Sequence, residues 1–331
     1  MKVTFFSSKN YEKPFFEKSN QGLGYDLNFL EVHLNKDTAM FAANSDVVCI
    51  FVNDVADRDT LRLLAEQNVK LIALRCAGFN NVDLKAATEF DIQVVRVPAY
   101  SPYSVAEHTL ALILTLNRKT HRAYNRVKEG NFSLHGLMGF DLHGKTVGLI
   151  GLGKIGKATA SIIKGFGCKI LGYDVYQDPE CISMGVEYTD IDTLLSQSDI
   201  ISLHCPLNPN TFHLINEKTI GQMKDGVMLI NTSRGALIDT KAVINALKTC
   251  KIAYLGLDVY EEEADLFFED LSDRIITDDV FMRLLTFHNV LITGHQAFFT
   301  QNAMTNIADI TMDNIAEFTT GKELENAVVF A

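Results

Sequence analysis

The sequence predicts an α/β protein with two domains, each built around a parallel β-sheet. A chain of 331 residues is longer than one typical domain. Short apolar runs rich in β-branched residues alternate with segments compatible with helices, as in repeated βα units. This alternation breaks near residue 101 and restarts after Gly144. With 47% hydrophobic and 21% charged residues, both domains can bury a core, and two domains leave a cleft between them.

Candidate strands set the domain boundaries. The first hundred residues contain apolar runs at 3–6, 47–52, 71–76 and 93–97. Six more candidate parallel strands follow at 146–150, 169–173, 200–203, 227–231, 252–257 and 290–293. We therefore expect a doubly wound domain over residues 102–297, inserted into a smaller α/β domain made of residues 1–101 and 298–331.

The break near residue 101 coincides with a predicted helix start. Ser104, with Glu107 three residues later, matches a capping box ahead of an apolar helix from Val105 to Leu116. A basic stretch follows at residues 118–128. It is either a solvated helix face or part of a subunit contact.

Charge and cysteine usage exclude several classes of protein. A net charge of −11 opposes non-specific binding to nucleic acid or to an anionic membrane. The six cysteines are widely spaced and form no C-x-x-C pair, so we expect reduced thiols, no structural disulfide and no metal site. The sequence shows neither a signal peptide nor a run of about 18 apolar residues. We expect a cytoplasmic protein.

A glycine-rich turn carries the strongest motif. Gly151, Gly153 and Gly156 match G-x-G-x-x-G between an apolar strand and a helix, the context expected of a Rossmann-type dinucleotide site. The helix start would supply the positive field that the net charge does not. Asp174 ends the next strand, where a carboxylate binds a ribose hydroxyl and repels a 2′-phosphate. NAD is therefore expected, in preference to NADP.

Polar residues follow the later strands of the same domain. Because ligands bind beyond the carboxyl ends of parallel strands, chemistry is expected there. Arg234 suits a substrate carboxylate, which it can hold through two parallel hydrogen bonds. His295 suits a proton donor during hydride transfer to a 2-oxo acid. A neighbouring carboxylate would favour the charged imidazole, and spacing alone leaves residues 261, 262 and 263, all glutamates, as candidates.

Four segments together resemble the D-isomer-specific 2-hydroxyacid dehydrogenases, and the resemblance extends over essentially the whole chain. The segments are residues 151–156, 231–235, 258–261 and 294–298. The family implies a Rossmann-type domain inserted into a flavodoxin-like one, with Arg234 binding the substrate, His295 as acid and base, and Glu263 as its carboxylate partner. Within the family the chain is most similar to members that reduce pyruvate to D-lactate with NADH in fermentation.

The resemblance also implies further site residues. For the substrate they are the backbone at Ala77 and Gly78 and the side chains of Tyr100 and Phe298, with Phe51 restricting the room for the substrate side chain. For the cofactor they are Gly151, Gly153, Lys154, Ile155, Gly156, Asp174, Cys205, Pro206, Thr211, Thr232, Ser233, Arg234 and Asp258. The chain has no tryptophan, which relatives acting on larger substrates carry near position 298, and Glu263 departs from the glutamine of formate dehydrogenases.

Two alternatives stay open beside pyruvate reduction. A related dehydrogenase could act on glyoxylate, hydroxypyruvate or a branched 2-oxo acid. A non-catalytic NAD-sensing protein would need a partner surface or an extension, of which the sequence gives no sign. The resemblance further implies a homodimer or homotetramer, built in part by the helix after Ser104.

Overall fold

The computed structural model describes residues 1–263 and 266–329, and divides the chain into two compact units. The first comprises Met1–Ser101 and Phe299–Ala331, and the second comprises Pro102–Phe298. The expected boundary at residue 298 differs from this division by one position, because Phe298 groups with the second unit. Residues 330 and 331, at the end of the expected smaller domain, lie outside the described residues.

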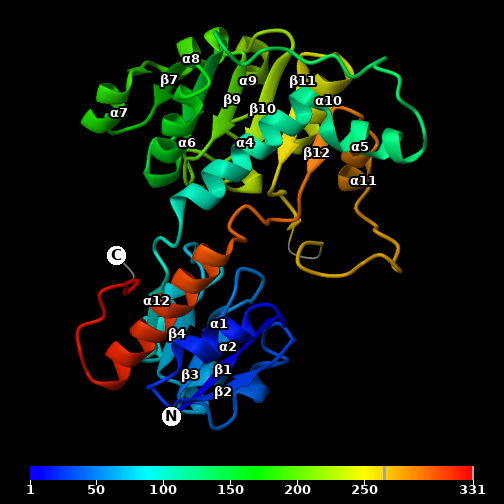
Figure 1. The fold of residues 1–331 in the computed structure, drawn as a ribbon. Helices are drawn as coiled ribbons and strands as arrows, with labels where there is room; N and C mark the ends of the chain where they lie inside the picture. Colours follow the sequence, from blue (N-terminus) through cyan, green and yellow to red (C-terminus); the bar gives the residue numbers. More distant parts are fainter. Residues whose placement is uncertain (264–265, 330–331) are drawn as a thin grey trace. The chain divides into compact units, whose positions relative to one another are not determined.

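The first unit contains a five-stranded parallel sheet in the order β2-β1-β3-β4-β5 (Figure 1). Its elements are β1 (Lys2–Phe5), α1 (Lys13–Ser19), β2 (Asp26–Phe29), η1 (Ala39–Ala42), β3 (Val47–Ile50), α2 (Arg58–Glu66), β4 (Leu71–Leu74), α3 (Leu84–Glu89), β5 (Gln93–Arg96) and α12 (Gln301–Thr319). Helices α2 and α3 pack on one face of the sheet, and α1 and α12 pack against each other on the opposite face. Asp57 and Asp83 cap α2 and α3 through side-chain hydrogen bonds.

The second unit contains a seven-stranded parallel sheet in the order β12-β11-β10-β9-β6-β7-β8. Its elements are α4 (Pro102–Arg118), α5 (Thr120–Lys128), β6 (Thr146–Ile150), α6 (Lys154–Lys164), β7 (Lys169–Tyr173), α7 (Pro179–Met184), β8 (Val186–Tyr188), α8 (Ile191–Gln197), β9 (Ile200–Leu203), α9 (Glu217–Gln222), β10 (Val227–Asn231), η2 (Gly235–Leu237), α10 (Thr240–Lys248), β11 (Ile252–Leu257), α11 (Asp279–Leu285) and β12 (Val290–Ile292). The order reverses beside β6, so this is a doubly wound sheet with its switch point at the glycine-rich turn.

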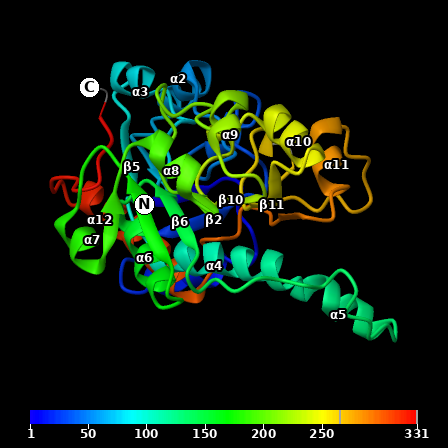
Figure 2. The same ribbon diagram turned by 90° about the horizontal axis from the view of Figure 1, so that it is seen from above.

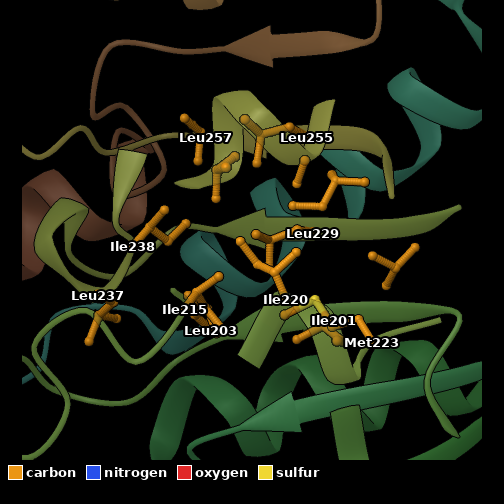
Figure 3. Close-up of a cluster of buried hydrophobic side chains, with 14 of the residues drawn as sticks. Ile201, Leu203, Ile215, Ile220, Met223, Leu229, Leu237, Ile238, Leu255 and Leu257 are labelled. Atoms are coloured by element: carbon orange, nitrogen blue, oxygen red, sulfur yellow. The ribbon is translucent and has the colours of Figure 1, made fainter. Parts of the chain in front are cut away.

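The core of the second unit has two layers, one on each face of the sheet. Helices α4 and α6 cover one layer, and α8 to α11 cover the other. Figure 3 shows the second layer, where Leu203, Leu229 and Leu255 from β9, β10 and β11 meet Ile220 and Met223 from the α9 region. Strands buried on both faces explain the continuous apolar runs of the sequence.

Three features differ from the sequence-based expectation. The edge strands β2 and β8 were not predicted, because they are short and only partly buried and so lack an apolar run. The predicted capping box is wrong: α4 begins at Pro102, so Ser104 and Glu107 lie within its first two turns. Proline is favoured in the first helical turn, where its missing N–H is not needed.

The basic stretch forms a helix of its own. Lys119, with φ of 51°, adopts a left-handed conformation that separates α4 from α5. No residue of α5 is buried. Figures 1 and 2 show α5 extending away from the sheet of the second unit. Within this unit the stretch is exposed, which is compatible with both interpretations, a solvated helix face and a subunit contact.

Candidate active site

The glycine-rich turn lies between β6 and α6, at the switch point of the seven-stranded sheet. Gly151 has φ of 94°, and a Cβ there would lie 2.5 Å from the backbone nitrogen of Cys205. A Cβ on Gly156 would overlap the carbonyl oxygen of Gly151. By contrast, no described atom lies within 4 Å of a Cβ built on Gly153. The first and third glycines are thus required by the fold itself, while Gly153 faces open space that a ligand can enter.

The start of α6 is uncapped. Gly153 stands at its N-cap position and has no side chain to accept a hydrogen bond, whereas α7, α8, α9, α10 and α11 each have an aspartate or asparagine cap. The first N–H groups of a helix need an external acceptor and carry the positive end of the helix dipole. A pyrophosphate would satisfy both requirements. Lys154 and Ile155 lie in this first turn.

Asp174 follows β7 and is anchored beside the glycine turn. Its Oδ2 accepts a hydrogen bond of 2.5 Å from the Leu152 N–H, and its Oδ1 accepts one of 3.2 Å from the Tyr176 N–H. A carboxylate held in this way can accept from a ribose hydroxyl and repels a 2′-phosphate. The glycine turn, the open helix start and Asp174 therefore fit NAD better than NADP.

His295 and Glu263 form a hydrogen-bonded pair at the same end of the sheet. The His295 Nδ1 lies 2.8 Å from Glu263 Oε1, and Glu263 Oε2 accepts from the Tyr260 N–H at 2.9 Å. The two side chains are 18% and 19% exposed, so the pair is shielded but still accessible to a small molecule. With Nδ1 bound to the carboxylate, Nε2 is left to exchange a proton with a ligand.

His295 adopts an unusual backbone conformation that Asp258 supports. Its φ is 50°, in the left-handed region that side chains other than glycine seldom occupy. The His295 N–H donates to the Asp258 carbonyl at 2.7 Å, and the buried Asp258 carboxylate accepts from the N–H groups of Gln296 and Ala297 at 2.9 and 2.8 Å. Asp258 thus fixes the loop that aims the imidazole. A contact of Asp258 with the cofactor stays a prediction.

A second histidine, which the sequence did not single out, completes this support. The His108 Nε2 on α4 lies 3.0 Å from Thr293 Oγ1 and 3.3 Å from Asp258 Oδ1. The Thr293 hydroxyl itself donates to Asp258 Oδ1 at 2.5 Å. The position of His108 within an apolar helix gave no signal of this role, since such a residue ordinarily belongs to a packed core.

The structure distinguishes the three glutamates that spacing left open. Glu263 lies beside His295, as described above. Glu261 instead contacts His213 Nε2 at 2.5 Å and accepts from the Thr240 hydroxyl at 3.0 Å. Glu262 is exposed. Geometry therefore favours Glu263 as the partner of His295, and Glu261 tethers the loop that contains His213.

Arg234 follows β10 on a loop that its neighbours hold in shape. The buried Asn231 side chain donates to the Arg234 carbonyl at 2.8 Å and accepts from the Ser233 N–H at 3.0 Å. The Arg234 Nη1 donates to the Ser233 carbonyl at 2.7 Å, and the guanidinium is only partly buried. A Cβ on Gly235 would overlap the Tyr260 backbone, so only glycine allows this loop to approach the segment before Glu263.

The other residues expected at the cofactor lie on loops after β9 and β10. The Ser233 hydroxyl donates to the Cys205 carbonyl at 2.8 Å, and the Thr211 hydroxyl donates to the Pro206 carbonyl at 2.7 Å. Thr232 is buried and shares a hydrogen bond of 2.9 Å with Thr109. Burial raises the pKa of the Cys205 thiol to about 11, so it is uncharged near neutral pH.

His204 follows β9 and backs the glycine turn. Its N–H donates to the Ile150 carbonyl at 2.7 Å, and its Nε2 lies 3.0 Å from Ser202 Oγ. Burial lowers the pKa of His204 to about 4, which keeps the imidazole neutral at pH 7.

The remaining expected substrate residues, other than Phe298, belong to the first unit. Ala77 and Gly78 form part of the loop after β4, and Phe51 follows β3. The Phe51 N–H donates to Asp54 Oδ2 at 2.6 Å, and its carbonyl accepts from Asn81 Nδ2 at 2.9 Å.

Two further aromatic residues were expected at the substrate. The Tyr100 carbonyl accepts from Asn306 Nδ2 at 2.5 Å. Phe298 lies in the second unit, where its ring meets His295 edge-on with the centroids 6.5 Å apart.

Two other kinds of site are absent from residues 1–263 and 266–329. No cluster of three or more histidine, cysteine, aspartate or glutamate side chains has an arrangement suited to a metal ion there. Of the helices described, none combines the length and apolarity needed to cross a membrane.

Comparison with known proteins identifies relatives over the full length. Residues 110–297 match the family model described as D-isomer specific 2-hydroxyacid dehydrogenase, NAD binding domain. A 2-hydroxyacid dehydrogenase homolog of Haemophilus influenzae is 55% identical, with 99% of each chain covered. D-lactate dehydrogenase of Escherichia coli is 53% identical, over 99% of this chain and 100% of that one.

A solved structure agrees with these sequence relationships. D-lactate dehydrogenase from Aquifex aeolicus, complexed with NAD and lactic acid, matches with a TM-score of 0.88 and 36% identity over 99% of both chains. The chain therefore belongs to the D-isomer-specific 2-hydroxyacid dehydrogenases and is an NAD-dependent oxidoreductase.

Proposed function

We propose that this enzyme is a D-lactate dehydrogenase that reduces pyruvate to D-lactate reversibly. The observation that carries the proposal is the pair of His295 and Glu263, held in the unit that also contains the dinucleotide turn. The names of relatives at 53% and 36% identity support the choice of substrate.

The proposed chemistry divides among a few side chains. Arg234 binds the pyruvate carboxylate and polarises the neighbouring carbonyl. His295 donates a proton from Nε2 to the carbonyl oxygen, and Glu263 keeps the imidazole oriented through its hydrogen bond to Nδ1. Bound NADH would supply the hydride to the carbonyl carbon. In the reverse direction His295 takes the proton from the hydroxyl of D-lactate.

Substrate size is the second part of the proposal. We assign the backbone of Ala77 and Gly78 to the substrate carboxylate, and Tyr100, Phe298 and Phe51 to the pocket wall. The Phe51 ring lies over the buried Arg75 guanidinium, 5.1 Å from ring centroid to Cζ, which restricts its movement. A fixed aromatic ring favours a methyl group over a larger substrate side chain.

The cofactor residues are assigned with the same reaction. Gly153, Lys154 and Ile155 would face the pyrophosphate, and Asp174 the adenosine ribose. Gly151 and Gly156 would serve the cofactor by allowing the tight turn and the close packing of α6. We place Cys205 and Pro206 near the adenosine and Asp258 by the nicotinamide, and we assign Thr211, Thr232 and Ser233 to the cofactor as well.

The decisive experiment follows NADH absorbance with pyruvate and then determines the configuration of the product by chiral chromatography. We expect turnover, and D-lactate as the product. The ranking of kcat/KM over pyruvate, glyoxylate, hydroxypyruvate and branched 2-oxo acids is expected to place pyruvate first. Absence of turnover with all of them would reject the enzymatic assignment and leave an NAD-binding regulator.

We further propose that the enzyme is a homodimer or homotetramer. Five apolar side chains on α5 and the chain after it are more than half exposed: Tyr124, Val127, Phe132, Leu134 and Met138. Such a surface is unusual for a monomer and suits a second copy of the chain. Light scattering should give at least twice the mass of one chain, and a monomer at working concentration would refute the proposal.

A cytoplasmic location is proposed as well. None of the six cysteines, all within the described residues, forms a disulfide, and Cys49, Cys76, Cys181 and Cys205 are buried, which suits a protein that folds under reducing conditions. Cell fractionation with a soluble marker would test it.

A further inference from the structure

The peptide group between Ala77 and Gly78 has unusual surroundings within the first unit. Both residues are half-buried, and neither the Ala77 N–H nor the Gly78 N–H has a hydrogen-bond acceptor among the described residues. The carbonyl oxygen of Ala77, by contrast, accepts from Arg96 Nη1 at 2.9 Å. The carbonyl oxygen of this peptide group thus has a hydrogen-bond donor, while its N–H can still donate to a ligand.

The Ala77 carbonyl and the Gly78 N–H belong to one trans peptide group, which fixes their relative direction. The carbonyl and the N–H of one peptide group point in opposite directions. The Arg96 guanidinium therefore lies behind the Gly78 N–H, on the side away from any acceptor that this N–H meets. A cation bound to the carbonyl polarises the peptide group, and this strengthens the N–H as a donor to an anion.

Arg96 is itself held firmly at the end of β5. Its N–H donates to the Asn326 carbonyl at 3.1 Å, and its carbonyl accepts from Asn314 Nδ2 at 3.0 Å. Asn326 Nδ2 donates to Asn314 Oδ1 at 2.8 Å, which ties the two anchors together. The guanidinium also stacks on the ring of Phe79, 5.0 Å from its centroid. Arg96 thus contacts the residues on both sides of Gly78.

The charge of Arg96 is not neutralised by a neighbour. Within the described part of the chain, no carboxylate lies at ion-pair distance from its guanidinium. Arg75 in the same unit differs, since it is fully buried and paired with Glu12 at 3.0 Å. A half-buried guanidinium without a carboxylate attracts an anion, whereas the Arg75 pair is neutral as a whole.

We propose that Arg96 is a positioning residue for the substrate carboxylate. It acts through the Ala77–Gly78 peptide by fixing the direction of the Gly78 N–H and by increasing its strength as a donor, without touching the substrate. The proposal rests on the assignment of Ala77 and Gly78 to the substrate carboxylate in the proposed function.

The test compares Arg96→Met and Arg96→Lys with Arg58→Met. Arg58 is the matched control because it also stacks on a phenylalanine, 5.3 Å from the Phe90 ring, but its own side chain is exposed at the start of α2. The measurements are KM and kcat for pyruvate, Kd for the unreactive pyruvate analogue oxamate in the presence of NADH, Kd for NADH alone, and Tm.

Arg96→Met is expected to raise KM for pyruvate and Kd for oxamate by about 10- to 100-fold, the range for losing a charge-assisted hydrogen bond. It should lower kcat by less than about fivefold and leave Kd for NADH unchanged, since the effect is on the carboxylate. Arg96→Lys keeps the charge and should recover about half of the loss on a logarithmic scale. Arg58→Met should change none of the binding constants.

Three results would overturn the proposal. In the first, Kd for oxamate in Arg96→Met stays within twofold of the wild-type value. In the second, Arg96→Lys is as impaired as Arg96→Met although its Tm is normal. The third result concerns the case in which Arg96→Met does not fold. In that case, wild-type Kd for oxamate in Arg96→Lys would overturn the proposal. A wild-type protein that binds NADH but neither turns over pyruvate nor binds oxamate would instead reject the proposed function.

Discussion

The two parallel sheets of this enzyme present different chemical groups at their ends. In the seven-stranded unit, charged side chains follow the strands: Arg234 after β10, Glu263 beyond β11 and His295 after β12. In the five-stranded unit, the groups assigned to the substrate are the backbone at Ala77 and Gly78, supported from behind by Arg96. The seven-stranded unit thus provides charged and proton-transferring side chains for the substrate, and the five-stranded unit provides backbone hydrogen-bond donors and pocket walls. Substitutions should therefore affect the chemical step in the first case and substrate affinity in the second.

The largest expected effect tests the side-chain half of this comparison. His295→Ala should lower kcat for pyruvate by about 10² to 10⁴, the range for a positioned acid, and leave Kd for NADH nearly unchanged. Steady-state assays and fluorescence titration of NADH would measure the two quantities. Glu262→Gln is the control, because Glu262 is exposed and lies next to Glu263 in sequence. A loss in kcat below about fivefold would show that the chemistry of the seven-stranded unit has been misassigned.

An intermediate effect tests the cofactor site within the seven-stranded unit. Asp174→Ser removes the carboxylate that accepts from the Leu152 N–H and that would repel a 2′-phosphate. We expect the ratio of kcat/KM for NADH over NADPH to fall by at least about tenfold, the effect of roughly one charge-assisted hydrogen bond. Parallel assays with the two cofactors give this ratio. An unchanged ratio would mean that other groups select the cofactor.

The smallest expected effect distinguishes the two units by their response to acid. The pKa of His204 falls from 6.5 to about 4 on folding, so the unfolded chain takes up a proton at a pH where the folded one does not. Stability of the seven-stranded unit should therefore decrease as pH falls from 6.5 toward 4, and His204 should contribute no pH dependence above that window. Hydrogen exchange at β9 and β4 would follow each unit separately.

The matched variant for this pH effect is His204→Gln, which keeps a side-chain hydrogen-bonding group but does not titrate. Exchange at β9 in His204→Gln should depend less on pH between 6.5 and 5 than in the wild-type protein. If the two proteins gave the same slope, proton uptake by His204 would not be the cause.

The sequence predicted the sheet strands that are buried on both faces, because continuous apolar runs report such burial directly. It failed for the edge strands β2 and β8, in which polar residues interrupt the apolar run, whereas the edge strands β5 and β12 were predicted. The start of α4 was predicted at Ser104 because its spacing to Glu107 imitates a cap, although Pro102 begins the helix. Local motifs of this kind compete with one another, and the sequence alone does not decide between them.

The candidate site shows the same division. Side chains with distinctive chemistry, such as Arg234 and His295, could be found because they follow strands of one sheet. Glu261 and Glu263 could not be told apart by spacing, because their partners His213 and His295 lie far away in the chain. The supporting residues His108 and Arg96 carry no motif at all. Their roles depend on hydrogen bonds to residues 185 and 19 positions away.

The uncapped start of α6 has a consequence for the lifetime of the protein. In the proposed cofactor site the pyrophosphate would complete this helix start, so bound nucleotide would contribute to folding stability. At nucleotide concentrations 100 times Kd, binding raises the free energy of unfolding by about 2.7 kcal/mol. Local opening at α6, and with it cleavage by proteases, should become rarer as the pool of nicotinamide nucleotide grows. The amount of enzyme in a cell would then follow the supply of its own cofactor.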